Sequence, residues 1–198
     1  TSNTWIRFDF DQVYALGLLR VWNYNGPLSA RGMNRVIIEY SATGGPSPSE
    51  WTRLGGAQKT FQFPRAPGTQ GYAGFDAADF KGARARHVVL TAAESEPNFG
   101  GTGNVGLSEV RFYMGPNEIA GPPAFFVGGP SPDTSGSVTA TTANSNGLAT
   151  AVKTIDGSGL DPSGQFHNNA SWQAGDSWLG ESTNVSSNGG GGSPTPNP

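Results

Sequence analysis

Hydrophobic and polar residues alternate in short runs along the first 114 residues, which is the pattern of half-buried strands. Trp5–Phe10 ("WIRFDF") alternates in this way, Leu16–Trp22 is more continuously apolar, and Val36–Ser41 is rich in β-branched residues. The runs end at segments rich in glycine, proline and asparagine, which are typical of turns. Further short strands are predicted at Trp51–Leu54, Thr60–Phe63, Tyr72–Phe75, His87–Thr91 and Leu107–Tyr113. Amphipathic helices are missing between the runs, so the pattern predicts an antiparallel, all-β sandwich.

A segment of different composition follows. Residues 115–136 are rich in glycine and proline around one apolar patch, Ala124–Val127. This is either a linker whose two phenylalanines dock elsewhere or an extended spacer in which they are incidental. A strand pattern resumes at Val138–Thr142, and the apolar run Ala149–Ile155 follows it. The chain therefore divides into a main body (1–114), a linker (115–136) and a completing segment (137–198) that ends in a Gly/Pro-rich tail.

Charge and composition limit the classes of partner and the cellular location that the sequence favours. The net charge is −3 and the 12 Lys and Arg residues are scattered, so nucleic acid is not an expected partner. A chain without cysteine has neither disulfides nor a cysteine nucleophile. The 30 glycines and 15 prolines, together with a Ser-, Thr- and Asn-rich surface, favour an extracellular and bacterial location. An apolar stretch long enough to span a bilayer is absent from the sequence.

Catalytic signatures are weak. The chain has two histidines, His87 and His167, and lacks a Gly-x-Ser-x-Gly, a His-Glu-x-x-His or a phosphate-binding loop. Carboxylates occur at predicted strand ends, where they are usually solvated, and nothing singles out a glycosidase-like pair. We expect that the protein is not an enzyme.

Several of these segments resemble discoidin domains, also called coagulation factor 5/8 type C domains. The resemblance lies in Trp5–Asn25, in Arg35–Ser41 with Trp51, in Gly106–Tyr113 ("GLSEVRFY"), and in Thr154–Asp161 ("TIDGSGLD") with Trp172 and Trp178. It implies a jelly-roll-type, galactose-binding-like sandwich. It also implies that Trp5, Trp22 and at least one of Trp172 and Trp178 belong to the core.

The two halves stand in the reverse of the usual order, because in discoidin domains the "IDG…W" opening precedes the "WIRFDF" strand. The chain is then a circular permutant, one register of a tandem repeat array, or a subunit whose residues 1–114 are completed by residues 137–198 of a neighbour. A truncated domain followed by the start of another would leave open strand edges, which aggregate. In each of the first three arrangements Val138, Val152 and Ile155 are expected in the core, and the tail is expected to be packed.

The resemblance also implies a structural calcium ion held by Asp156 and Glu109, with Ser158 as a weaker candidate. Calcium prefers six to eight oxygen ligands, several of them backbone carbonyls. The glycine-rich turn at Asp156–Gly159 offers such carbonyls. The alternative is an Asx turn at Asp156 and a surface carboxylate at Glu109.

Sugar-binding relatives hold galactose-type sugars with His, Arg and Asn side chains beside an aromatic wall. The corresponding candidates are, in this sequence, Arg31, Asn34 and His167, then Asn25, Trp172 and Phe99. We therefore expect a non-catalytic, extracellular carbohydrate-binding or adhesive module whose partner is a glycan or cell-surface polysaccharide. The alternative is a structural subunit or tandem repeat of an extracellular fibre that self-associates by strand completion. Membrane insertion is not expected, because a basic apolar spike is missing.

Overall fold

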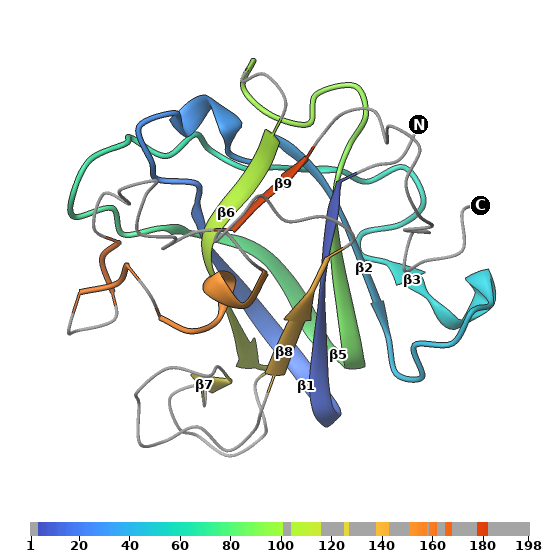
Figure 1. Cartoon of the computed structure of the whole chain (residues 1–198). Helices are drawn as coiled ribbons and strands as arrows, with labels where there is room; N and C mark the ends of the chain where they lie inside the picture. Colours follow the sequence, from blue (N-terminus) through green and yellow to red (C-terminus); the bar gives the residue numbers. More distant parts are fainter. Residues whose placement is uncertain are drawn as a thin grey trace.

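The computed structural model describes residues 4–100, 104–115, 125–126, 138–142, 151–157, 159–161, 165–167 and 178–181 (Figure 1). Its strands are β1 (Trp5–Asn23), β2 (Arg35–Ser41), β3 (Thr52–Arg53), β4 (Phe61–Gln62), β5 (Phe75–Ala92), β6 (Asn104–Met114), β7 (Phe125–Phe126), β8 (Val138–Thr141) and β9 (Trp178–Glu181). Three short 3₁₀ turns accompany them, η1 (Ser29–Arg31), η2 (Pro48–Glu50) and η3 (Ala151–Thr154).

The strands form one curled sheet in the order β3-β2-β5-β1-β6-β7, and β4, β8 and β9 pair with β2, β1 and β6. Every pairing between these strands is antiparallel. The first half of β1 pairs with β8 and its second half pairs with β6, yet both halves bury side chains in one core. The predicted all-β, sandwich-like architecture is therefore confirmed, whereas the galactose-binding-like topology stays a prediction.

Two long strands replace several of the short strands expected from the sequence. The predicted break between Trp5–Phe10 and Leu16–Trp22 is wrong, because β1 continues through both runs. The β5 strand likewise includes residues 76–86, which the pattern did not predict. Register shifts interrupt the β1–β5 pairing, and each shift breaks the alternation of apolar and polar residues. Gly17 lies at such a shift, where an added Cβ would stand 2.7 Å from the Gly115 Cα.

Aromatic side chains fill the centre of the core. Phe112 packs edge-on against Phe8 and Phe10, with ring centroids 5.2 and 5.1 Å apart, and all three are almost completely buried. Fully burying each such side chain contributes about 1.5–3 kcal/mol. Trp22 is also buried, but it lies outside this cluster, and Trp5 is only half-buried. The predicted burial of Trp22 is confirmed, whereas the core position predicted for Trp5 is wrong, because its side chain lies on the opposite side of β1 from Ile6.

Residues of the predicted completing segment join the sheet within the same chain. Phe8 in β1 pairs with Ala140 in β8, and Leu107 in β6 pairs with Trp178 in β9. Trp178 is completely buried, and Ile155 is buried beside it in the same core cluster.

Val152 is 47% exposed, so its predicted core position is wrong. The 3₁₀ turn η3 directs Ala151 and Thr154 inward and leaves Val152 on the opposite side. The apolar patch at 124–127 contributes β7, whose backbone pairs with β6. The predicted packing of the Gly/Pro-rich tail falls outside the described residues.

Candidate functional site

Backbone hydrogen bonds join two loops that are far apart in sequence and that carry Arg31, Asn34 and Phe99. The Phe99 N–H donates to the Ala30 carbonyl at 2.9 Å, and the Asn34 N–H donates to the Pro97 carbonyl at 3.1 Å. All three side chains are half-buried, so each presents part of its surface to solvent. We call Arg31, Asn34 and Phe99 the loop cluster.

The amide of Asn34 is weakly held within the loop cluster. Its Nδ2 lies 3.5 Å from the Asn98 carbonyl, at the limit for a hydrogen bond, and its buried Oδ1 has no hydrogen-bond partner among the described residues. A buried acceptor without a partner costs free energy. A sugar hydroxyl or a water that donates to this oxygen would remove that cost.

Two other predicted sugar ligands are part of the scaffold. Asn25 is completely buried, where its Nδ2 donates to the Thr69 carbonyl at 2.8 Å and its Oδ1 accepts from the Gly68 N–H at 2.8 Å. His167 is completely buried too, and its backbone exchanges hydrogen bonds with Tyr72. Neither side chain faces solvent. Trp172 falls outside the described residues.

Glu109 lies in β6, close to Asp156 and Gly157. Its side chain has no exposed surface, and both carboxylate oxygens lack a hydrogen-bond partner among the described residues. The nearest cation is Arg111, whose Nε lies 3.8 Å from Oε1, which is too long for a hydrogen bond. The alternative of a surface carboxylate at this position is therefore wrong.

The surroundings of Glu109 oppose its charged form. Burial raises the pKa of the carboxyl well above its usual value, Arg111 lowers the pKa, and the nearby Asp156 carboxylate raises it further. The backbone N–H of Gly157 lies close enough to favour the charged form, although it falls short of full hydrogen-bond geometry. An ionised carboxylate buried in this way requires a cation.

Asp156 and Gly157, which belong to the glycine-rich turn predicted as a calcium site, lie close to Glu109. Gly157 and Gly159 adopt positive φ angles of 72° and 79°, which favour glycine, so the turn needs both glycines. Asp156 makes an ion pair with Lys153 at 3.1 Å and would have to share its carboxylate with a metal. Ser158 falls outside the described residues.

Among the described residues, Glu109 is the one buried carboxylate that could contribute to a cation site here. No three His, Asp or Glu side chains converge in the part of the chain that the structure describes. A cation at Glu109 would therefore take most of its ligands from backbone carbonyls, which is a calcium-like set. The buried, orphaned carboxylate fits this interpretation.

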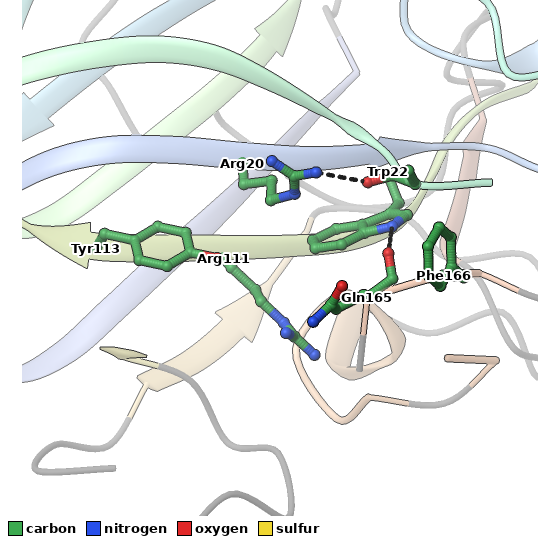
Figure 2. A pocket seen from close by; sticks show the side chains of 7 residues that line it. Arg20, Trp22, Arg111, Tyr113, Gln165 and Phe166 are labelled. Atoms are coloured by element: carbon green, nitrogen blue, oxygen red, sulfur yellow. Dashed lines mark hydrogen bonds between the residues drawn. The ribbon is translucent and has the colours of Figure 1, made fainter. Parts of the chain in front are cut away.

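A pocket of about 310 Å³ lies on the outer side of β1 and β6 (Figure 2). It is lined by Arg20, Trp22, Ala73, Arg111, Tyr113, Gln165 and Phe166. Sequence reasoning missed this pocket, because its residues meet only through the pairing of β1 with β6 and the packing of residues 165–166 on both. The available signal was the row of polar and aromatic side chains at alternate positions 20, 22, 109, 111 and 113.

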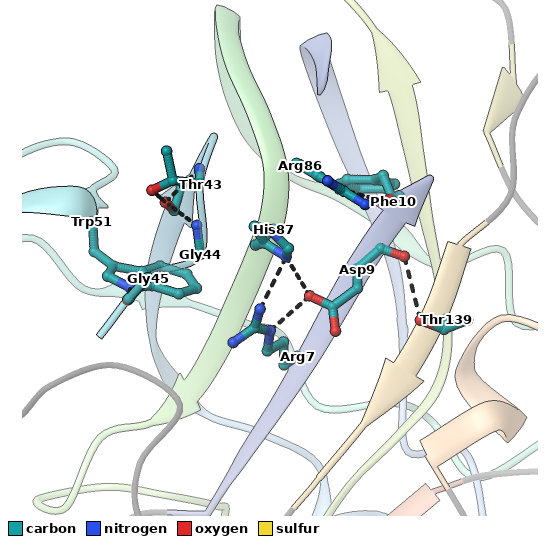
Figure 3. A network of polar contacts seen from close by, with 11 residues as sticks. Arg7, Asp9, Phe10, Thr43, Gly44, Gly45, Trp51, Arg86, His87 and Thr139 are labelled. Carbon is teal, nitrogen blue, oxygen red and sulfur yellow. Dashed lines mark hydrogen bonds and ion pairs between the residues drawn. The ribbon is translucent and has the colours of Figure 1, made fainter. Parts of the chain in front are cut away.

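A polar network on the same outer side of β1 surrounds His87 (Figure 3). Its Nδ1 lies 2.5 Å from Asp9 Oδ1 and 3.0 Å from an Arg7 guanidinium nitrogen, and Arg7 stacks on Trp51. Gly44 packs against the other face of the ring, where an added Cβ would stand 2.5 Å from Nε2.

The contacts around His87 link β1, β5 and the loop after β2. Ser41 stands opposite His87 on β2, but its Oγ accepts hydrogen bonds from the backbone N–H groups of Thr43 and Gly44. The Nδ1 atom of His87 contacts Arg7 and Asp9, and Gly44 packs against the Cδ2–Nε2 edge of the ring.

Comparison with protein-family models, with curated proteins and with solved structures finds no match. The resemblance to discoidin domains therefore stays a prediction. Among the described residues there is no helix long and apolar enough to cross a membrane.

Proposed function

We propose that this protein is a non-catalytic, extracellular carbohydrate-binding module that recognises a glycan through the loop cluster. The observation that carries the proposal is the backbone pairing of two loops about 65 residues apart, which carry Arg31, Asn34 and Phe99. An arginine, an under-bonded amide and a partly exposed aromatic ring are the groups that bind a sugar's hydroxyls and its apolar C–H face. The backbone bonds that join the two loops hold these groups in place before a ligand arrives.

Calcium is the second part of this proposal, and its role is structural. Glu109 would be the buried carboxylate ligand, and carbonyls of the turn at Asp156–Gly159 would supply further oxygens. The ion would take the place of the proton that the raised pKa of Glu109 keeps on the buried carboxyl. It would also tie the turn to β6. The support is the position of Glu109 together with the glycine turn beside it.

A glycan screen on the folded, calcium-loaded protein tests the sugar site. Any glycan that binds should then be titrated against the Arg31→Ala variant, with Arg84→Ala as the control. Arg84 is an exposed arginine on β5, outside the loop cluster. Loss of charged hydrogen bonds should weaken binding to Arg31→Ala by about 10- to 100-fold. Equal affinities for the two variants would count against the loop cluster.

The fibre hypothesis requires residues 137–198 of one subunit to complete the sheet of a neighbour. The residues of β8 and β9 pair with β1 and β6 of the same chain, so the sheet closes without a neighbour. This pairing supports the module over the fibre. Completion between subunits stays a prediction, for which a dilution experiment is given in the Discussion.

A further inference from the structure

The pocket on the outer side of β1 and β6 contains a pair of arginines held in fixed positions. Arg20 in β1 stands directly opposite Arg111 in β6. Both guanidinium groups stack on the Trp22 ring, with the carbon of each 5.3 and 5.2 Å from the ring centroid. Figure 2 shows the indole between the two side chains. Trp22 is itself fixed, because its Nε1–H donates to the Gln165 carbonyl at 3.2 Å.

Arg20 retains donors that can face a ligand. A guanidinium has five N–H groups. Two of them are used at 2.7 Å by Asp76 and at 2.9 Å by the Ala73 carbonyl. The Asp76 side chain is about half exposed, so this ion pair is weak and open to competition from a ligand.

The pocket has the charge and the surfaces for an acidic sugar. Arg20 and Arg111 are the two charged side chains among the residues that line the pocket, on a chain whose net charge is −3. Phe166 is 41% exposed at the rim and offers a ring on which a pyranose can stack. A volume of about 310 Å³ is at the small end of ligand pockets, which suits one sugar unit.

We infer that this pocket is a second binding site, specific for an anionic saccharide, in which Arg20 and Arg111 bind the acidic group and Phe166 packs against the sugar ring. The site uses none of the loop-cluster residues and goes beyond the glycan site proposed above. Guanidinium groups bind planar carboxylates and sulfates with two parallel hydrogen bonds, so both kinds of acidic sugar share the required chemistry.

Three probes test the inference by isothermal titration on the calcium-loaded protein. They are trigalacturonic acid, its methyl ester and a sulfated galactose trisaccharide. The ester has the same rings without the charge, so it should bind at least tenfold more weakly than the acid if the carboxylate is recognised. Preferred binding of the sulfated sugar would identify sulfate as the anion. Failure of both anionic sugars to bind at millimolar concentration overturns the inference, as does equal binding of the ester.

Matched variants locate the site. Arg20→Gln should weaken binding of the anionic sugar by about 10- to 100-fold, and Phe166→Ala should weaken it by about tenfold. Arg84→Gln removes the same charge from an exposed position and should leave the affinity within about twofold. A loss in Arg84→Gln equal to that in Arg20→Gln would show general charge attraction and overturn the inference. Thermal melting of each variant checks that the fold is retained.

The Arg31→Ala variant shows whether the anionic sugar binds in the pocket or at the loop cluster. The inference expects Arg31→Ala to bind the anionic sugar as the wild type does, and it expects the Trp22 indole N–H signal to shift on titration in NMR spectra. If Arg31→Ala abolishes binding and Arg20→Gln does not, the pocket inference fails while the proposed loop site gains support. If only Arg20→Gln reduces binding and the loop cluster binds no glycan, the pocket inference is supported and the proposed loop site fails.

Discussion

Replacing Glu109 by glutamine tests whether the buried carboxylate is a metal ligand. Glutamine keeps the size of the side chain and removes the charge. In the metal-free protein the pKa of Glu109 is raised, first by burial, so the folded state holds a proton that the unfolded state releases at lower pH. Stability must therefore fall as the pH rises from about 4.3, the pKa of an unfolded glutamate, towards the folded pKa. Below about pH 4.3 the protonated Glu109 makes its full contribution to the free energy of unfolding.

The expected change in the free energy of unfolding has two parts, one from the proton on Glu109 and one from a bound calcium ion. A single group that titrates between the two states changes the free energy of unfolding by at most about 1.4 kcal/mol per pH unit. Calcium reverses the situation at neutral pH, because it binds the ionised carboxylate. Calcium at 100 times its Kd would add about 2.7 kcal/mol, which raises Tm by about 5–11 °C for a chain of this size.

Thermal melts of wild type and Glu109→Gln, with chelator and then with excess calcium, form the assay. Wild type should gain the calcium increment and the variant should not, while the chelated variant should melt above the chelated wild type at pH 7. Glu96→Gln is the control, because Glu96 forms only an exposed ion pair with Arg35 at 2.6 Å. Equal calcium increments in wild type and Glu109→Gln would refute the metal assignment. A chelated variant less stable than wild type would refute the account of the buried charge.

The remaining predictions concern the sugar site, the core and assembly. Arg31→Ala should lower glycan affinity by about 10- to 100-fold with Tm unchanged, since Arg31 is half-buried on a surface turn; a Tm loss that parallels the affinity loss would contradict this. Ile155→Asp should prevent folding, because it places an unpaired charge in the core; circular dichroism showing a native, cooperative melt would contradict it. If the sheet closes within one chain, light scattering should show a folded 20.6 kDa monomer at submicromolar concentration, whereas persistence of oligomers under dilution, with loss of folding when they dissociate, would favour completion between subunits.

The sequence predicts strands well where one face of the strand is buried without interruption. Val36–Ser41 and Leu107–Tyr113 fall within β2 and β6 to within a few residues. It fails along β1 and β5, because register shifts reset the alternation and a continuous strand then reads as two shorter ones. Val152 was misplaced for a related reason, since an apolar run predicts burial without showing that a 3₁₀ turn directs one of its members outward.

The candidate sites differ in how far the sequence could predict them. Glu109 and the turn at Asp156–Gly159 were paired through the resemblance alone, and the complete burial of Glu109 is not visible in its position along the strand. Asn25 looked like a sugar ligand because loop asparagines often are, yet its amide satisfies backbone groups at residues 68 and 69. The side-by-side arrangement of Arg20 and Arg111 depends on the pairing of strands about 90 residues apart, which single-chain periodicity does not report.

Two of the three candidate sites lie where the main body meets the completing segment. Glu109 comes from β6 and its proposed metal partners come from the turn at Asp156–Gly159, while the anion pocket joins Trp22 to Gln165 through a hydrogen bond. Both sites therefore exist only when the completing segment is docked. The loop cluster, in contrast, is built entirely within residues 30–99. A cation bound at Glu109 would stabilise the docked segment and would thereby fix the pocket wall at Gln165 and Phe166. Calcium should accordingly strengthen binding of the anionic sugar and leave binding at the loop cluster unchanged, because a ligand can shift only an equilibrium between states that it distinguishes.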